Sequence, residues 1–192
     1  DRSRGLGDVY KRQDKAIEEG YSFDAAPKLN KERVAIIGGG PAGLSAAYQL
    51  RKMGYASTVF EERKELGGMM RYGIPGYRTP RDLLDKEIER IINLGDIEVV
   101  TGKRVGKDLP LDDIEKSHDA VLWTIGCWNG KAIPVEGGDA TNCITGVDFL
   151  EAFCDGRLKV GSKKVICVGG GDTSIDVVSV ARRLGHISKM NE

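Results

Sequence analysis

The sequence predicts an α/β fold in which a mostly parallel sheet is flanked by helices, and three observations support this class. Short β-rich apolar runs alternate with longer stretches whose apolar residues recur at helical spacing. Two glycine-rich turns, GGGPAG at 38–43 and GGGDTS at 169–174, each stand between an apolar run and a helical stretch. The 26 glycines exceed the usual share of about 7%, which is typical of a protein with several tight turns.

The first part of the chain predicts a strand, a helix and a second strand in succession. Val34–Ile37 is a short β-rich apolar run, and Pro41–Met53 has helix formers with apolar residues at helical spacing. Proline suits the first helical position, because its missing N–H would have no partner there. Ala56–Phe60 is expected to be the second strand, followed by Glu61. These elements form a βαβ unit of about thirty residues.

Further elements follow a glycine-rich loop. The loop at 65–78 is too long for a simple connection, so we expect it to line a site. Thr79 and Pro80 predict the start of a helix that ends at about Leu94 and has an apolar stripe along one face. The remaining expected elements are strands at Ile97–Thr101, Ala120–Thr124 and Lys164–Val168 and helices at Leu111–Lys116, at Gly146–Cys154 and after the second glycine turn. Trp123 is expected to lie in a buried strand.

Charge and cysteine content exclude several functional classes. Lysine plus arginine equals aspartate plus glutamate at 29 each, so no overall field attracts nucleic acid or anionic lipid. No apolar run approaches the roughly 18 residues of a membrane span. The four cysteines contain no CxxC pair, which argues against zinc, iron–sulfur and dithiol sites within this chain. We therefore expect no nucleic-acid or membrane partner and a reducing, cytoplasmic location.

The first thirteen residues, DRSRGLGDVYKRQ, are polar, lack periodicity and differ from the sequence that follows. The codons GAT GTG TAT AAG AGA CAG would encode Asp8–Gln13, and that DNA resembles a transposon end used to build sequencing libraries. We expect residues 1–13 to be an adapter-derived tail that has no function; an ordinary disordered tail is the alternative. Residues 14–30 are expected to be a linker.

The first glycine turn predicts a dinucleotide site. Gly38, Gly40 and Gly43 give GxGxxG between a strand and a helix: the first glycine allows the tight turn, the second allows backbone to approach a pyrophosphate, and the third allows helix and strand to pack closely. The helix N-terminus adds free N–H groups and a partial positive charge. Glu61, 18 residues after Gly43, stands where a carboxylate accepts hydrogen bonds from an adenosine ribose. A structural turn without ligand is the alternative.

The second glycine turn predicts a second dinucleotide site. Gly169 and Gly171 occupy the first two glycine positions, and Ser174 replaces the third glycine. Serine is small enough to permit close packing. A structural turn without ligand remains the alternative here too.

Three segments together resemble one known family. VAIIGGGPAGLSAAYQL, TVFEERKELGGMMRYGIPGYRTPRDLLDKEIERI and VICVGGGDTSIDVVSVARRLG are similar to the glutamate synthase small-subunit (beta-subunit) family of pyridine nucleotide-disulfide-type flavoproteins. The resemblance covers about Lys31 to Gly185, and the GG…RYGIP…R.P loop is its most distinctive part. It implies a Rossmann-like FAD/NAD(P)-binding fold whose first unit binds FAD and whose second unit binds NAD(P)H.

The resemblance also implies roles for particular residues. For FAD, it implies that the pyrophosphate is held by Gly38, Gly40, Pro41, Ala42 and Gly43. It implies that Glu61 binds the ribose, that Gly68 and Arg71 lie along the flavin side of the loop, and that Val105 contacts adenine. Thr124 and Gly126 occupy the family's ATG position, which is TIG in this chain. For the nicotinamide dinucleotide it implies Gly169, Gly171, Asp172 and Thr173. Asp172 stands where asparagine is common, so a negative charge would lie near phosphates.

The implied reaction is hydride transfer from NAD(P)H to FAD, followed by electron transfer to an iron–sulfur domain or partner subunit. The protein would position the rings, and no catalytic acid, base or nucleophile is assigned. The resemblance implies a fragment of a longer oxidoreductase: the N-terminal part of an FAD-binding domain at 31–130, a connecting segment at 131–162 and the start of an NAD(P)-binding domain at 163–192. A non-catalytic dinucleotide-binding or interaction module is the alternative. The sequence does not distinguish NADH from NADPH.

Overall fold

The computed structural model describes residues 14–159, 161 and 164–190, with the backbone alone for 185–190. The expected adapter-derived tail at 1–13 and the expected boundary at 162 and 163 lie outside the described residues. The described chain forms two compact units. The first contains the residues up to Gly68 together with Pro80–Gly126, and the second contains Met69–Thr79 and the residues from Cys127 onward. The division into FAD-binding, connecting and NAD(P)-binding segments remains a prediction.

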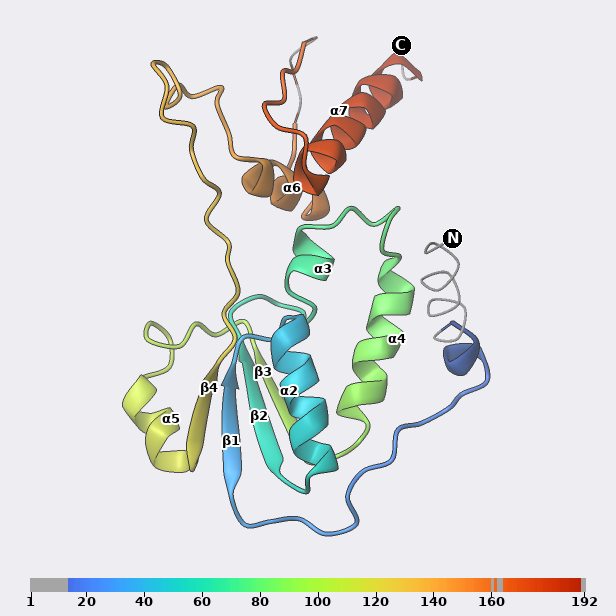
Figure 1. Ribbon diagram of the computed structural model, residues 1–192, viewed down its shortest axis with the longest axis vertical. Helices are drawn as coiled ribbons and strands as arrows, with labels where there is room; N and C mark the ends of the chain where they lie inside the picture. Colours follow the sequence, from blue (N-terminus) through green and yellow to red (C-terminus); the bar gives the residue numbers. More distant parts are fainter. Residues whose placement is uncertain (1–13, 160, 162–163, 191–192) are drawn as a thin grey trace. The chain divides into compact units, whose positions relative to one another are not determined.

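The first unit is built on a four-stranded parallel sheet with the strand order β3-β2-β1-β4 (Figure 1). The strands are β1 (Arg33–Ile37), β2 (Ala56–Glu61), β3 (Ile97–Thr101) and β4 (Ala120–Trp123), and the helices are α2 (Pro41–Lys52), α4 (Arg81–Ile92) and α5 (Leu111–Ser117). These bounds lie within about two residues of those expected from the sequence. The mostly parallel α/β fold is therefore confirmed.

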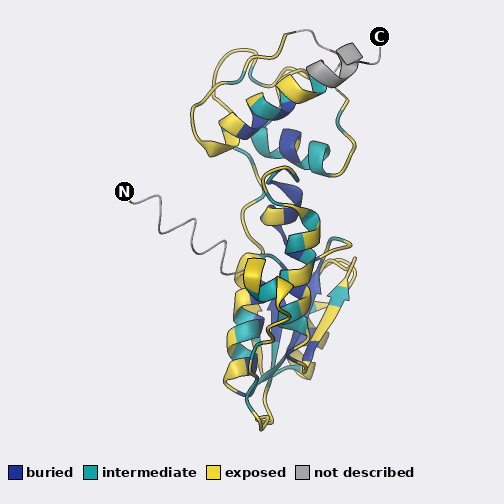
Figure 2. Ribbon diagram, turned by 90° about the vertical axis from the view of Figure 1, so that its right-hand side faces the viewer, coloured by how far each residue is buried: buried dark blue, intermediate teal, exposed yellow. Residues whose placement is uncertain are grey.

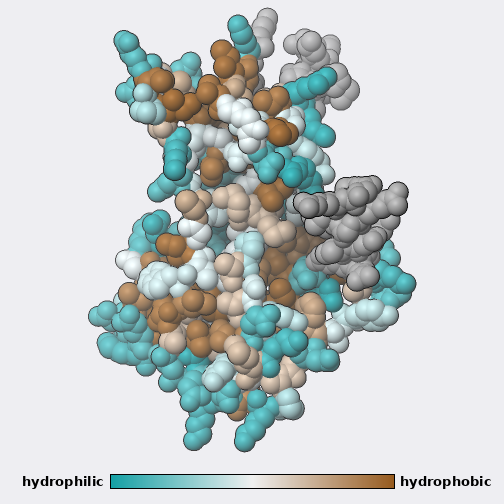
Figure 3. Space-filling view, in the orientation of Figure 1, coloured by the Kyte–Doolittle hydropathy of each residue, from teal (hydrophilic) through white to brown (hydrophobic). Residues whose placement is uncertain are grey.

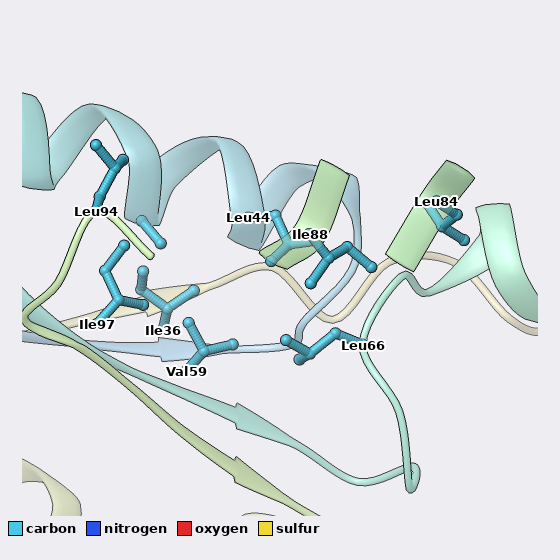
Figure 4. Close-up of a cluster of buried hydrophobic side chains, with 9 residues drawn as sticks. Ile36, Leu44, Val59, Leu66, Leu84, Ile88, Leu94 and Ile97 are labelled. Atoms are coloured by element: carbon cyan, nitrogen blue, oxygen red, sulfur yellow. The ribbon is translucent and has the colours of Figure 1, made fainter. Parts of the chain in front are cut away.

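Alternate residues of the strands supply two hydrophobic clusters, because successive side chains of a strand point to opposite faces. Ile36 and Val59 pack against α2 and α4 on one face, where Leu44, Leu66 and other apolar side chains complete the cluster (Figure 4). On the other face Ala35, Ile37 and Phe60 pack with Ile114 of α5. Buried residues accordingly follow the strands in the burial view (Figure 2). Both faces of β1 are covered, which fixes the position of the turn that follows it.

The edge strand β4 corrects one expectation. Trp123 was expected in a buried strand, yet its side chain is 51% exposed, and Leu122 is also exposed. The reason is topological, since β4 pairs with β1 only and ends the described sheet.

The second unit consists of α3 (Met69–Tyr72), α6 (Gly146–Cys154), α7 (Asp172–Met190) and connecting segments. Helices α6 and α7 pack through a cluster formed by Phe149, Leu150, Val177 and Val180. The expectation of a strand at Lys164–Val168 was wrong, because these residues form no strand. A strand needs a hydrogen-bonded neighbour, and the described residues of this unit contain none. Ile166 and Val168 are consequently exposed, and apolar surface is visible over this unit (Figure 3).

Arg51 connects three segments of the first unit: α2, the N-terminal stretch before β1 and the turn before β3. Its side chain is 10% exposed; Nε donates to the Gly95 carbonyl at 3.0 Å, Nη1 donates to the Ala26 carbonyl at 3.0 Å, and Nη2 lies 3.0 Å from Asp96 Oδ2. Phe23, in the same N-terminal stretch, packs against Tyr48 with ring centroids 4.9 Å apart. The stretch before β1 is thus held against α2.

We expect Arg51→Ala to lower the free energy of unfolding by about 1.5–3 kcal/mol, because it leaves the part-buried hydrogen bonds to the Gly95 and Ala26 carbonyl groups and the ion pair with Asp96 unmade. Urea denaturation measures the change. The exposed Gln49→Ala in the same helix is the matched control and should change stability by less than about 0.5 kcal/mol. Equal urea midpoints for the two variants would show that the contacts of Arg51 do not stabilise the first unit.

The ion pair between Glu98 and Arg33 is expected to make the stability of the folded chain depend slightly on pH. Its carboxylate lies 2.9 Å from Arg33 Nη2, and the hydrogen bond from Arg33 is the main reason that the pKa of Glu98 lies below its usual value of 4.5. A carboxyl pKa that is lower in the folded state adds stability above the unfolded pKa, and this contribution is lost as the pH falls. We expect Glu98→Gln to lose less stability than the wild type on acidification, and thermal melts across the acidic range check this. Parallel acid profiles would contradict it.

Candidate functional site

The first glycine turn leaves the carboxyl end of β1 and enters α2. Gly38 has φ +112°, a conformation that favours glycine, and a Cβ placed there would lie 2.8 Å from the Thr124 carbonyl carbon. Its N–H donates to the Phe60 carbonyl at 2.8 Å. At Gly43 a Cβ would overlap the Gly38 carbonyl oxygen and lie 2.9 Å from Thr124 Oγ1. The protein's own packing therefore requires both glycines.

Gly40 differs from the other two glycines of the motif. Its φ of −80° and ψ of −174° suit any residue, and the nearest atom to a Cβ at this position is the Gly68 Cα at 3.6 Å, an ordinary contact. No side chain caps α2, which begins at this point, so the helix presents first-turn N–H groups without intrahelical partners. Nothing in the fold requires glycine at 40. A ligand that approaches this backbone would require it.

The Glu61 carboxylate lies at the end of β2 beside the turn. It is 7% exposed; Oε2 accepts from the Gly39 N–H at 2.8 Å, and Oε1 accepts from the Arg63 N–H at 2.9 Å. These bonds fix the carboxylate against the glycine turn. Because each carboxylate oxygen accepts more than one hydrogen bond, Glu61 retains acceptor capacity for a hydroxyl group.

The start of the glycine-rich loop packs against the same turn. The Gly67 N–H donates to the Gly39 carbonyl at 2.9 Å. Gly68 has φ +51°, and a Cβ there would lie 2.7 Å from the Gly40 Cα. Gly68 thus borders Gly40, and the role of this loop in lining a ligand site stays a prediction. Arg71 is buried in α3 and belongs to the second unit.

Two of the remaining candidates occupy different parts of the first unit. Thr124 Oγ1 donates to the Gly38 carbonyl at 2.9 Å and to that of Ile37 at 3.1 Å, so this side chain fastens the turn to the end of β4. Val105 is half-buried and packs with the cluster on the α5 face of the sheet.

The exposed candidates lie at turn and helix starts. Gly126 has φ +73° just after the end of β4. Pro41 and Ala42 are exposed in the first turn of α2. Their proposed contacts with FAD stay predictions.

The second turn repeats the division of roles seen in the first. Gly169 has φ +132°, and a Cβ there would lie 2.6 Å from Ser174 Oγ, whereas a Cβ at Gly171 would meet no atom within 4 Å. Asp172 and Thr173 are exposed at the start of α7. The second glycine is again the one that the fold leaves open. The roles of these four candidates in nucleotide binding stay predictions.

The sequence did not reveal the ion pair between Arg78 and Asp176, which lies in the second unit. Arg78 Nη1 lies 2.8 Å from Asp176 Oδ1 and 2.7 Å from Oδ2, and the Asp176 side chain is 7% exposed. The available signal was an aspartate on the apolar face of a helix in SIDVVSV. Its partner lies 98 residues away in the chain, which no local pattern indicates.

Within the described ranges, no three or more His, Cys, Asp and Glu side chains are grouped so that they could hold a metal ion. Of the helices that the structure describes, none has both the length and the apolar character needed to cross a membrane.

The parallel sheet and its glycine turn at the carboxyl end of β1 define a dinucleotide-binding α/β protein. Residues 32–190 match the family described as pyridine nucleotide-disulphide oxidoreductase. The chain belongs to this family, whose members bind FAD and NAD(P)H. The expected relationship to the glutamate synthase small subunit is confirmed, since relatives named glutamate synthase small chain match this chain.

Two curated relatives show the extent of the similarity. The chain is 43% identical over 164 residues to the NADPH-Fe(3+) oxidoreductase subunit beta of Geobacter sulfurreducens, a match that covers 83% of this chain and 24% of the relative. It is 33% identical over 181 residues to the glutamate synthase [NADPH] small chain of Bacillus subtilis, which covers 88% of this chain and 36% of the relative. The chain thus spans about a quarter of the first relative and just over a third of the second.

Solved structures support the fold. A 2-naphthoyl-CoA reductase in complex with 2-naphthoyl-CoA has a TM-score of 0.61 at 24% identity, with 86% of this chain and 23% of that chain covered. FprA from Mycobacterium tuberculosis in complex with NADPH has a TM-score of 0.60 at 22% identity, with 64% of this chain and 29% of that chain covered. At these identities the likeness concerns the fold alone.

Proposed function

We propose that the chain is part of an FAD-dependent NAD(P)H oxidoreductase that resembles the glutamate synthase small subunit. In this proposal hydride passes from NAD(P)H to FAD, and electrons pass on to an iron–sulfur domain or partner subunit. The names of the relatives support the nicotinamide substrate, since two of them specify NADPH. The free cysteines Cys127, Cys143, Cys154 and Cys167 support a reducing, cytoplasmic location.

The observation that supports FAD binding most strongly is the open backbone at Gly40. The turn is rigid, because Gly38 and Gly43 are held by close packing and Thr124 bonds to the Gly38 carbonyl. Gly40 is the one glycine of the GxGxxG motif at which the structure has room for a Cβ, and yet the residue there is glycine. A pyrophosphate that approaches the N-terminus of α2 gives this glycine a function.

In this proposal, several residues of the first unit contact FAD. The backbone of Gly40, Ala42 and Gly43 would hold the pyrophosphate with N–H groups, and Glu61 would accept hydrogen bonds from the adenosine ribose. Gly68 would let the loop approach the same region without a side chain in the way. When bound, FAD supplies the hydride-accepting ring, and the protein contributes position and electrostatics.

The test is reduction of the FAD-loaded chain under anaerobic conditions by NADPH and, separately, by NADH. The proposal predicts loss of the visible flavin absorbance with at least one donor. Retention of FAD without reduction by either donor would favour a non-catalytic dinucleotide-binding module. Reduction by dithionite serves as the positive control for the signal.

A further inference from the structure

Two adjacent residues of the second unit contact α7 at two points. Arg78 forms its ion pair with Asp176, and the guanidinium carbon of Arg183 lies 3.8 Å from the ring centroid of Tyr77. Asp176 and Arg183 are seven positions apart, which places them two turns apart on one side of the helix. The segment that ends at Thr79 is therefore fixed along α7 between Asp176 and Arg183.

Arg78 neutralises a buried charge. The Asp176 carboxylate is 7% exposed, and a buried carboxylate without a partner is costly. Both hydrogen bonds from Arg78 use Nη1, so the guanidinium retains N–H donors on Nε and Nη2. The Arg78 side chain is half-exposed, and these donors are available for a further acceptor.

Asp172 lies one helical turn before Asp176, on the same side of α7 and directly after Gly171. Its charge suits the helix dipole but repels a phosphate that would bind at the helix N-terminus. The pKa of Arg78 is raised chiefly by the hydrogen bond to Asp176, and the charge of Asp172 raises it further. The Arg78 guanidinium thus lies within the field of both carboxylates.

We propose that Arg78 is a positioning residue of the second nucleotide site: held by Asp176, its guanidinium offsets the charge of Asp172 and lets the start of α7 accept a nucleotide phosphate. This inference rests on the proposed function, because it assumes that the second turn binds NAD(P)H. It explains how an aspartate is tolerated at a phosphate-binding turn. It also gives a role to a loop residue that lies outside the glycine motif.

The test compares variants that remove the ion pair without leaving a buried charge. Arg78→Gln combined with Asp176→Asn should weaken binding of NADPH or NADH by about tenfold, which corresponds to about 1.4 kcal/mol. Adding Asp172→Asn to this pair should restore the affinity to within about threefold of the wild type, because the charge that Arg78 offset is gone. Arg78→Lys should retain most of the affinity, since it keeps the positive charge.

A merely structural role for Arg78 predicts no rescue by Asp172→Asn, and that result would overturn the inference. The matched control is Arg182→Gln, which changes an exposed arginine of α7 that takes no part in the ion pair. This control should leave the affinity unchanged. Unfolding free energies provide a measurement without nucleotide: Asp172→Asn should stabilise the chain more when Arg78 is absent than when it is present. If this coupling is absent, the inference about Arg78 is wrong and the proposed function is unaffected. If the coupling is present but the wild type binds neither NADPH nor NADH, the proposed function is contradicted at this site.

Discussion

Gly43→Ala is expected to destabilise the first unit by about 3 kcal/mol or more, because the added Cβ would overlap the Gly38 carbonyl oxygen. The obstacle is backbone, and the second close atom, Thr124 Oγ1 at 2.9 Å, is held by two hydrogen bonds. A shift of the Gly38 carbonyl requires the turn itself to move, and a shift of Thr124 Oγ1 breaks its hydrogen bonds to the Ile37 and Gly38 carbonyl groups. A loss of this size is a large part of the about 5–15 kcal/mol that stabilises a typical domain.

Urea denaturation followed by far-ultraviolet circular dichroism measures the effect of Gly43→Ala. Gly76→Ala provides a matched control, since a Cβ at Gly76 would meet no atom within 4 Å. The control should change the free energy of unfolding by less than about 0.5 kcal/mol. A Gly43→Ala chain that unfolds at the wild-type midpoint would show that α2 and β1 are not in close contact at this position.

Gly40→Ala is expected to leave folding intact and to weaken FAD binding by at least about tenfold, or about 1.4 kcal/mol. The backbone angles at Gly40 suit alanine, and its Cβ would find an ordinary 3.6 Å contact with Gly68. The same methyl group would occupy the space through which a pyrophosphate reaches the N–H groups of α2. Loss of affinity without loss of stability separates a ligand requirement from a folding requirement.

Titration of FAD into the Gly40→Ala chain, monitored by flavin fluorescence, gives the dissociation constant. Thermal melts without FAD should agree between Gly40→Ala and the wild type. Unchanged FAD affinity in this variant would show that the pyrophosphate does not approach Gly40. A strong loss of stability would instead show that the turn is packed more tightly than the structure describes.

Local patterns in the sequence were sufficient to predict the elements of the first unit. The strands around Ile36 and Val59 and the helix that begins at Pro41 were found within one or two residues, because apolar periodicity and proline at a helix start are local signals. The position of Glu61 at the end of β2 followed from the same pattern. What failed was non-local: a strand at 164–168 needs a neighbouring strand, and the exposure of Trp123 depends on which strand ends the sheet.

The candidate site shows the same division between local and non-local information. The GxGxxG spacing located the turn and assigned different roles to its three glycines. In the structure, packing requires glycine at 38 and 43 but not at 40, as the roles in turn formation and packing predict. The Arg78–Asp176 pair joins residues 98 positions apart, so its prediction requires knowledge of tertiary structure.

The central claim is that the turn between β1 and α2 binds FAD, and titration of FAD into the purified wild-type chain tests it most directly. We predict saturable binding of one FAD per chain, with flavin absorbance that remains with the protein through gel filtration. A folded, colourless chain that takes up no added FAD would contradict the claim.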